Sequence, residues 1–226
     1  MHDSRTDQGG VPVWDLPVRL FHWTVVALVI FSFVTAQIGG NAMQYHEWSG
    51  FAILTLVLFR VLWGFLGGTH ARFGDFVRGP RAVMAYAASL RRGAARRFAG
   101  HNPLGGWMVI ALIVCLLVQT GTGLFANDDV MLEGPLAKHV SKHTSDLLSE
   151  IHEANFVVLA TLIVLHVAAA LFYLLAKREN LIRPMFSGRK QPPAGEPLLP
   201  AREGSLALAA VLLALCAGGV WLMVHA

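Results

Sequence analysis

Five long apolar stretches constrain this chain more than any other feature of its sequence. Each is about as long as the roughly 20 residues that a helix needs to cross a bilayer. They cover residues 18–38, 47–67, 104–126, 151–175 and 205–224. Charged residues make up only 14% of the chain, against about 25% in a typical soluble domain. The sequence therefore predicts an all-α integral membrane protein, with a four-helix transmembrane bundle and an appended fifth transmembrane helix.

The segments between these stretches divide the chain into parts. Residues 1–16 are polar and predict a short lead without a cleavable signal peptide. Residues 17–183 hold the four-helix domain, and the arginine-rich segment 68–103 inside it predicts a helix on the membrane surface. Residues 184–204 are rich in proline, glycine and charge, so they predict a linker. Residues 205–226 are then a C-terminal transmembrane helix.

Positive charge is distributed unevenly among the connecting segments. Arginine and lysine are concentrated between the second and third stretches and between the fourth and fifth, whereas acidic residues outnumber lysines between the third and fourth. Because positively charged loops stay in the cytoplasm, we expect a cytoplasmic N-terminus and a C-terminus on the other side. The net charge of +4 fits contact with membrane lipid. It does not indicate nucleic-acid binding, because no nucleic-acid motif accompanies it.

Four histidines lie at two depths within the predicted helices. His152 and His166 are fourteen residues apart in one stretch, so they lie on almost the same helix face, roughly 21 Å apart along the axis. The direction of each helix pairs His22 with His166 near the cytoplasm. It pairs His46 with His152 near the outer face. Neutral imidazoles can fill both axial positions of a haem iron, and such an iron suits electron transfer. The sequence predicts two haems, which are non-covalent because there is no CxxCH motif.

A haem-free transporter or scaffold is the alternative for these histidines. Zinc ligands usually cluster at one depth, often with carboxylates or cysteines, whereas these histidines form two layers and no carboxylate lies mid-span. Cys115 and Cys216 have no metal-motif spacing and are expected to be buried small apolar residues.

Arg60 is the other unusual residue, because it lies within the apolar second half of its stretch. It follows His46 by fourteen residues, so it lies on nearly the same face and one haem layer further in. A buried arginine requires an anion. We therefore expect Arg60 to bind a propionate of the cytoplasmic haem. A snorkelling arginine at the helix end is the alternative. Arg19, one turn before His22, is a candidate of the same kind.

Five segments, in order from about residue 11 to residue 190, resemble the bacterial cytochrome b561 family. The most similar branch is the one related to the cytochrome b subunit of nickel–iron hydrogenases. The segments are VWDLPVRLFHW, HEWSGFAILTLVLFRVLWGFLG, ARFGDFVRGP, GHNPLGGWMV and LHVAAALFYLLAKRENLIRPMFSGRK. The resemblance implies a four-helix carrier of two haem b groups in the bacterial cell inner membrane. It places the ligands on His22, His46, His152 and His166, and it does not cover residues 205–224.

The resemblance also implies a function, namely electron transfer between the quinone pool and a c-type cytochrome or a dehydrogenase or hydrogenase subunit. We expect quinone near His101 and Asn102, which precede the third stretch. His101 would exchange the quinol proton and Asn102 would hydrogen-bond a carbonyl. The alternative is that Asn102 merely begins the helix. The alternative function is that of a superoxide:quinone oxidoreductase. An approach to the outer haem would then be lined by Lys138, His139, Lys142 and His143, and acidic residues in the same segment weaken that case.

Overall fold

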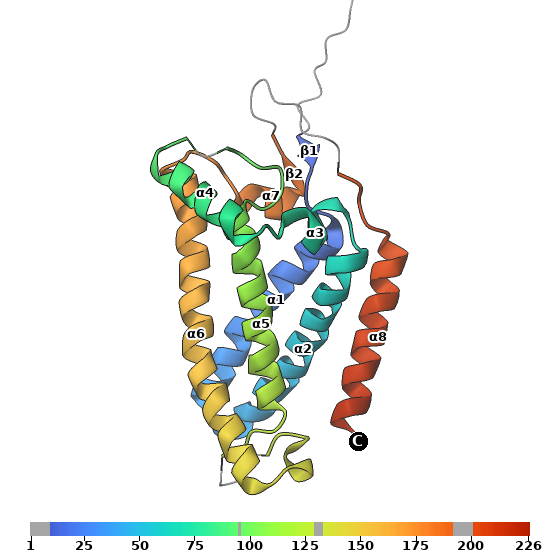
Figure 1. Cartoon of the computed structure of the whole chain (residues 1–226). Coiled ribbons are helices and arrows are strands. Elements are labelled where there is room, and N and C mark those ends of the chain that lie inside the picture. Colours follow the sequence, from blue (N-terminus) through green and yellow to red (C-terminus); the bar gives the residue numbers. More distant parts are fainter. Residues whose placement is uncertain (1–9, 95, 129–132, 192–200) are drawn as a thin grey trace, which may run out of the picture.

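The computed structural model describes residues 10–94, 96–128, 133–191 and 201–226. Within them, five helices are long and apolar enough to cross a membrane (Figure 1). These are α1 (Leu16–Ile38), α2 (Met43–Leu66), α5 (Pro103–Gly123), α6 (Lys142–Leu175) and α8 (Leu206–Val224). The predicted all-α membrane fold is confirmed. The first nine residues of the expected lead and residues 192–200 of the expected linker lie outside the described residues.

Short elements connect and cap these helices. One turn of 3-10 helix, η1 (Gly40–Ala42), joins α1 to α2, and another, η3 (Ala137–His139), precedes α6. The remaining elements lie together at one end of the bundle. They are β1 (Val11–Pro12), η2 (Thr69–Ala71), α3 (Phe73–Phe76), α4 (Pro80–Arg91), α7 (Ile182–Ser187) and β2 (Arg189–Lys190). The amphipathic surface helix expected within residues 68–103 is α4.

Capping residues determine where the long helices begin. The side chains of Asp15, Asn102, Ser141 and Ser205 each accept a backbone N–H from the first turn of the helix that follows. The cap at Ser141 starts α6 at residue 142, whereas the apolar pattern alone places the start at residue 151. The loop between α5 and α6 is correspondingly shorter than expected.

The membrane helices form two pairs joined through α2 and α5. α1 packs on α2, α5 packs on α6, and α2 also contacts α5. Among the described residues α1 and α6 make few direct contacts. Apolar side chains fill the centre, among them Val25, Val57, Ile113 and Leu159 from four different helices. Cys115 belongs to the same cluster, as expected of a small buried residue.

α8 lies on the outside of the bundle, against α2 (Figure 1). Its Ala209, Leu212 and Cys216 pack on Phe59 and Trp63 of α2. The fifth helix is therefore an addition to a four-helix core.

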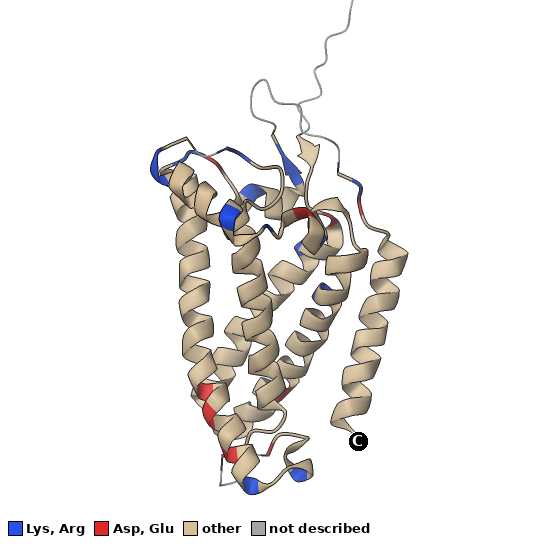
Figure 2. Ribbon diagram, in the orientation of Figure 1, with Lys and Arg blue, Asp and Glu red and all other residues tan. Residues whose placement is uncertain are grey.

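Lysine and arginine gather mainly at the end of the bundle that carries α4, α7 and the β1–β2 pair (Figure 2). We call this the basic end, and we call the end with η1 and η3 the opposite end. The acidic residues of α6 lie toward the opposite end (Figure 2). This asymmetry is the one that the charge pattern of the sequence predicts.

Residues 184–190 were expected to begin a linker, but they belong to the folded domain. Pro184 lies in the first turns of α7, and Gly188 ends that helix with a φ of 76°. The proline and the glycine therefore mark a helix start and stop rather than a flexible segment. β2 then pairs antiparallel with β1, with Val11 opposite Lys190.

Candidate cofactor site

The four histidines singled out in the sequence meet in two pairs across the bundle. At the basic end, the ring centroids of His22 on α1 and His166 on α6 are 6.3 Å apart. At the opposite end, the ring centroids of His46 on α2 and His152 on α6 are 6.1 Å apart. We call these the basic-end pair and the opposite-end pair. All four side chains are half-buried, and the depth pairing expected from the sequence is the pairing that the fold produces.

The separation of the rings fits two imidazoles on one metal ion. A bond from a metal to a histidine nitrogen is about 2.0–2.1 Å long, and the ring centre lies roughly 1.1 Å beyond that nitrogen, so two rings on opposite sides of one ion have centroids about 6 Å apart. Both pairs have this separation. The donor set of each pair, two neutral imidazoles, is the axial set that haem iron accepts.

Second-shell hydrogen bonds orient both rings of the opposite-end pair. His46 Nδ1 lies 2.9 Å from the carbonyl oxygen of Ser32, and His152 Nδ1 lies 2.8 Å from that of Gln119. A carbonyl oxygen only accepts, so each Nδ1 carries the proton and each Nε2 presents its lone pair. Fixing the tautomer in this way is how proteins prepare histidine to bind a metal.

The contact between α5 and α6 supports His152. A Cβ atom on Gly123 would lie 2.9 Å from Cε1 of His152, so only glycine allows the ring to approach α5 this closely. One turn further along α6, Asn155 Nδ2 donates to the side-chain oxygen of Gln119 at 2.7 Å and to the carbonyl oxygen of Cys115 at 3.0 Å. These bonds hold the two helices together beside the carbonyl that accepts from His152.

Arg60 is buried in α2, with 3% of its surface exposed. Its guanidinium lies over the ring of Phe73, 5.4 Å from the ring centroid. Phe73 in turn packs into a space that a side chain at Gly64 would fill. The alternative of a snorkelling side chain does not fit this burial. Nη1 of Arg60 has no hydrogen-bond partner among the described residues.

Other buried nitrogens at the basic end share this property. Within the described part of the chain, five side-chain nitrogens are buried without a hydrogen-bond partner, namely Arg19 Nε, His22 Nδ1, Arg60 Nη1, His70 Nε2 and His101 Nδ1. Buried polar groups are nearly always paired in native proteins. The concentration of unpaired nitrogens at one end of the described chain therefore indicates a binding site there.

His101 lies between two aromatic rings. Its ring centroid is 4.6 Å from that of Trp14 and 4.8 Å from that of Phe76. Burial, with smaller contributions from the charges of Arg60, His166, His70 and His22, lowers the pKa of His101 to about 3. The imidazole is therefore uncharged at neutral pH, which suits a hydrogen bond to a ligand better than proton exchange in that range.

Asn102 has two structural partners. Its side-chain oxygen caps α5 by accepting from Gly105 N at 2.8 Å, and its Nδ2 donates to the hydroxyl of Tyr173 at 3.1 Å. The hydroxyls of Tyr173 and Tyr86 are 2.7 Å apart. Burial and the bond to Tyr173 raise the pKa of Tyr86, so its hydroxyl stays protonated. Sequence reasoning missed both tyrosines, although Tyr173 follows His166 by seven residues and so shares its helix face.

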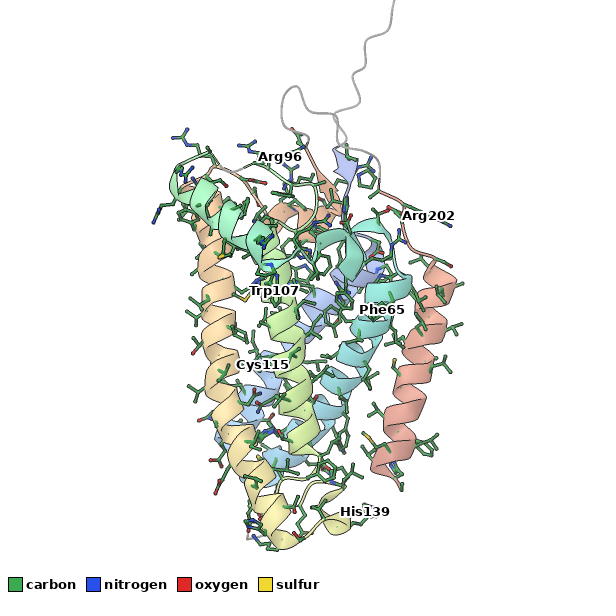
Figure 3. The ribbon with its side chains drawn as sticks, viewed as in Figure 1. Phe65, Arg96, Trp107, Cys115, His139 and Arg202 are labelled. Atoms are coloured by element: carbon green, nitrogen blue, oxygen red, sulfur yellow. The ribbon has the colours of Figure 1, made fainter. Side chains whose placement is uncertain are left out.

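The tyrosine pair lines a cavity of about 210 Å³ between α4 and the end of α6. Leu90, Lys177, Glu179 and Arg96 also line it, and Figure 3 labels Arg96 at this end of the bundle. Glu179 is paired with Lys190 at 2.7 Å. At the opposite end, Lys138 is exposed, but Lys142 forms an ion pair with Asp146.

Comparison with known proteins gives one family. Residues 13–188 match the family described as prokaryotic cytochrome b561, which agrees with the resemblance in the sequence. A probable Ni/Fe-hydrogenase B-type cytochrome subunit of Bradyrhizobium diazoefficiens is 24% identical over 80% of this chain and 86% of its own length. The protein of the same description from Rhodobacter capsulatus is 24% identical over 80% of this chain and 81% of its own length. No solved structure matches the chain significantly.

Proposed function

This chain belongs to the prokaryotic cytochrome b561 family, and we propose that it holds two haem b groups and carries electrons across its membrane between quinone and a partner redox protein. It is a multi-pass membrane cytochrome that binds haem b and takes part in electron transfer. We propose in addition that it binds two haems, that the four histidines are their ligands, that quinone is a redox partner and that the chain has a defined orientation in the membrane. The observation that carries the proposal is the separation of about 6 Å in both histidine pairs.

The histidines define what each site does. His22 with His166, and His46 with His152, would each hold one haem iron through two imidazole nitrogens, a donor set that suits electron transfer. Haem supplies reversible one-electron chemistry when it is bound. The two sites are stacked along α6, because His152 and His166 are separated by about 21 Å along the helix axis. Electrons can therefore cross most of a bilayer core of about 30 Å within this one chain.

Arg60 and Arg19 are the groups that we assign to the propionates at the basic end. The buried guanidinium of Arg60 presents an unpaired donor, and a charge-assisted bond to a carboxylate would satisfy it. Nε of Arg19 is buried and unpaired in the same way, one turn before His22.

The names of the relatives and the distribution of charge support a proposed partner and a proposed orientation in the membrane. Both named relatives are described as hydrogenase cytochrome subunits, so a hydrogenase or another dehydrogenase subunit is the partner that we favour, with a c-type cytochrome as the alternative. The basic end is assigned to the cytoplasm of the bacterial inner membrane by the positive-inside rule. This places the N-terminus in the cytoplasm and the C-terminus in the periplasm.

The basic end is also where we place the quinone. Asn102 donates a hydrogen bond to the hydroxyl of Tyr173, which is bonded in turn to the hydroxyl of Tyr86. Both tyrosines line the cavity. The bond between the two tyrosines uses one O–H, and the other has no acceptor among the described residues, so it can donate to a quinone carbonyl. His101 precedes Asn102 and is within electrostatic range of both histidines of the basic-end pair. Glu179 is the carboxylate in the cavity wall that can accept a quinol proton.

Removing both hydroxyls tests this placement. In the double variant Tyr86→Phe/Tyr173→Phe, haem content should stay unchanged, while reduction of the haems by added quinol slows about tenfold or more, because a hydrogen bond to the substrate is lost. Stopped-flow absorbance on the protein in lipid nanodiscs measures the rate. Tyr45→Phe, an exposed tyrosine at the opposite end, is the matched control. An unchanged rate in the double variant would move the quinone away from this cavity.

A further inference from the structure

His70 is a partly buried histidine at the basic end that the proposed electron path does not use. It lies in η2, directly after α2, and 13% of its side chain is exposed. Its Nδ1 is 2.8 Å from Oδ2 of Asp75 on α3. A carboxylate only accepts, so this bond places a proton on Nδ1 and fixes the orientation of the ring. Nothing in the local sequence around His70 shows that α3 covers it.

The second ring nitrogen of His70 has no protein partner. Nε2 is buried and unpaired among the described residues, like Nη1 of Arg60 and Nδ1 of His101. The charges of Arg60, His166, His70 and His22 all act on His101. His70 and Arg60 are therefore within electrostatic range of His101, as are both histidines of the basic-end pair. A side chain at Gly100 would lie 3.2 Å from the His70 ring, so the segment before α5 packs directly against it.

Several buried nitrogens without a partner around one point indicate a ligand. A buried polar group without a partner is costly, and the nitrogens here belong to an arginine, which always donates, and to two imidazoles, which donate only from a protonated nitrogen. Carboxylate oxygens are the acceptors that such a set prefers, since arginine and protonated histidine both make charge-assisted bonds to them. Haem b carries two propionate carboxylates, and the basic-end pair is the cofactor site next to these donors.

We propose that His70, held in place by Asp75, binds a propionate carboxylate of the basic-end haem and together with Arg60 raises the reduction potential of that haem. The inference rests on the proposed function, since it requires a haem at the basic-end pair. Because Nδ1 donates to Asp75, Nε2 can donate to the propionate only when the ring holds a proton on both nitrogens, so this bond would bring a positive charge to the haem. Positive charge nearby favours the reduced, more negative state of the iron. The other charged side chains beside His70 are Asp15, Arg202 and Glu203, which line a small crevice with it.

Haem dimethyl ester has no free carboxylates, so it distinguishes binding of a propionate by His70 from a purely structural role of this residue. The apoprotein is reconstituted with haem or with haem dimethyl ester, for the wild type, for His70→Gln and for Asp75→Asn. Midpoint potentials come from redox titration of the visible spectrum, and variants lacking His22 or His46 identify the two haems. His139→Gln, an exposed histidine at the opposite end labelled in Figure 3, is the matched control.

With haem, His70→Gln should lower the potential of the basic-end haem and leave that of the opposite-end haem unchanged. Asp75→Asn should shift it in the same direction by less. With the dimethyl ester, wild type and both variants should agree. An equal shift with both cofactors, or no shift with haem in either variant, overturns the proposal. Wild-type protein that binds no haem at the basic-end pair would instead overturn the proposed function, so the two failures are distinguishable.

Discussion

Alanine in place of His46 or His152 should remove the haem at the opposite end and leave most of the haem at the basic end, so that haem content falls from two per chain to one. The reason is that these two imidazoles would hold the same haem, so loss of either one would empty that site and not the other. Alanine at His22 or His166 should remove the other haem instead. Pyridine haemochrome assay of the purified variants, with protein determined independently, gives the ratio.

The exposed His139, replaced by alanine, is the control for the loss of a histidine as such. Circular dichroism and a monodisperse elution profile establish that each variant is folded. Equal loss of both haems from every folded single variant would contradict the pairing by depth.

Asp15→Ala should be the most destabilising substitution outside the histidine pairs. Asp15 is 7% exposed, and its carboxylate accepts three hydrogen bonds. These come from Val18 N at 3.1 Å, Trp63 Nε1 at 3.1 Å and Gly68 N at 3.2 Å. Alanine would leave all three buried donors unpaired, and each hydrogen bond to a charged group contributes about 1.5–3 kcal/mol. Allowing for relaxation and some water entry, we expect a loss of about 3–5 kcal/mol in the free energy of unfolding.

Unfolding of the detergent-solubilised protein, followed by far-ultraviolet circular dichroism, measures this loss. Ser141→Ala is the matched control, because Ser141 caps α6 and, in the part of the chain that the structure describes, makes no bond to another membrane helix. Loss of that cap should cost only about 1 kcal/mol. If the two variants were equally stable, Asp15 would be no more than a helix cap, and the link that it makes between α1 and the end of α2 would contribute nothing.

The helices and both histidine pairs could be predicted from the sequence because they depend on the lengths of the apolar stretches and on the period of the α-helix. Helix rise sets the depth of His22 or His166 without knowledge of any contact. The cap at Ser141 extends α6 beyond its apolar stretch, so composition misplaced the start of that helix. Pro184 and Gly188 looked like linker residues, since the sequence does not show that β2 pairs with β1 at the other end of the chain.

The surroundings of the basic-end pair depended on tertiary contacts and were largely missed. His70 becomes a candidate only because Asp75 and the segment before α5 enclose it. Tyr86 lies on a surface helix, and its role follows from the bond to Tyr173, 87 residues later in the chain. Arg60 was the exception, because an arginine inside an apolar stretch can be recognised from the sequence alone, without knowledge of its contacts.

The proposal of two haems in one four-helix bundle is tested most directly by the haem-to-protein ratio of the wild type. The protein is purified in mild detergent, its haem is extracted as the pyridine haemochrome, and its mass is determined by amino-acid analysis. A ratio of two haem b per chain, with a reduced-minus-oxidised spectrum typical of six-coordinate iron, is the expected result. A ratio of one in fully haem-supplied cells, or a spectrum with an open axial position, would contradict it.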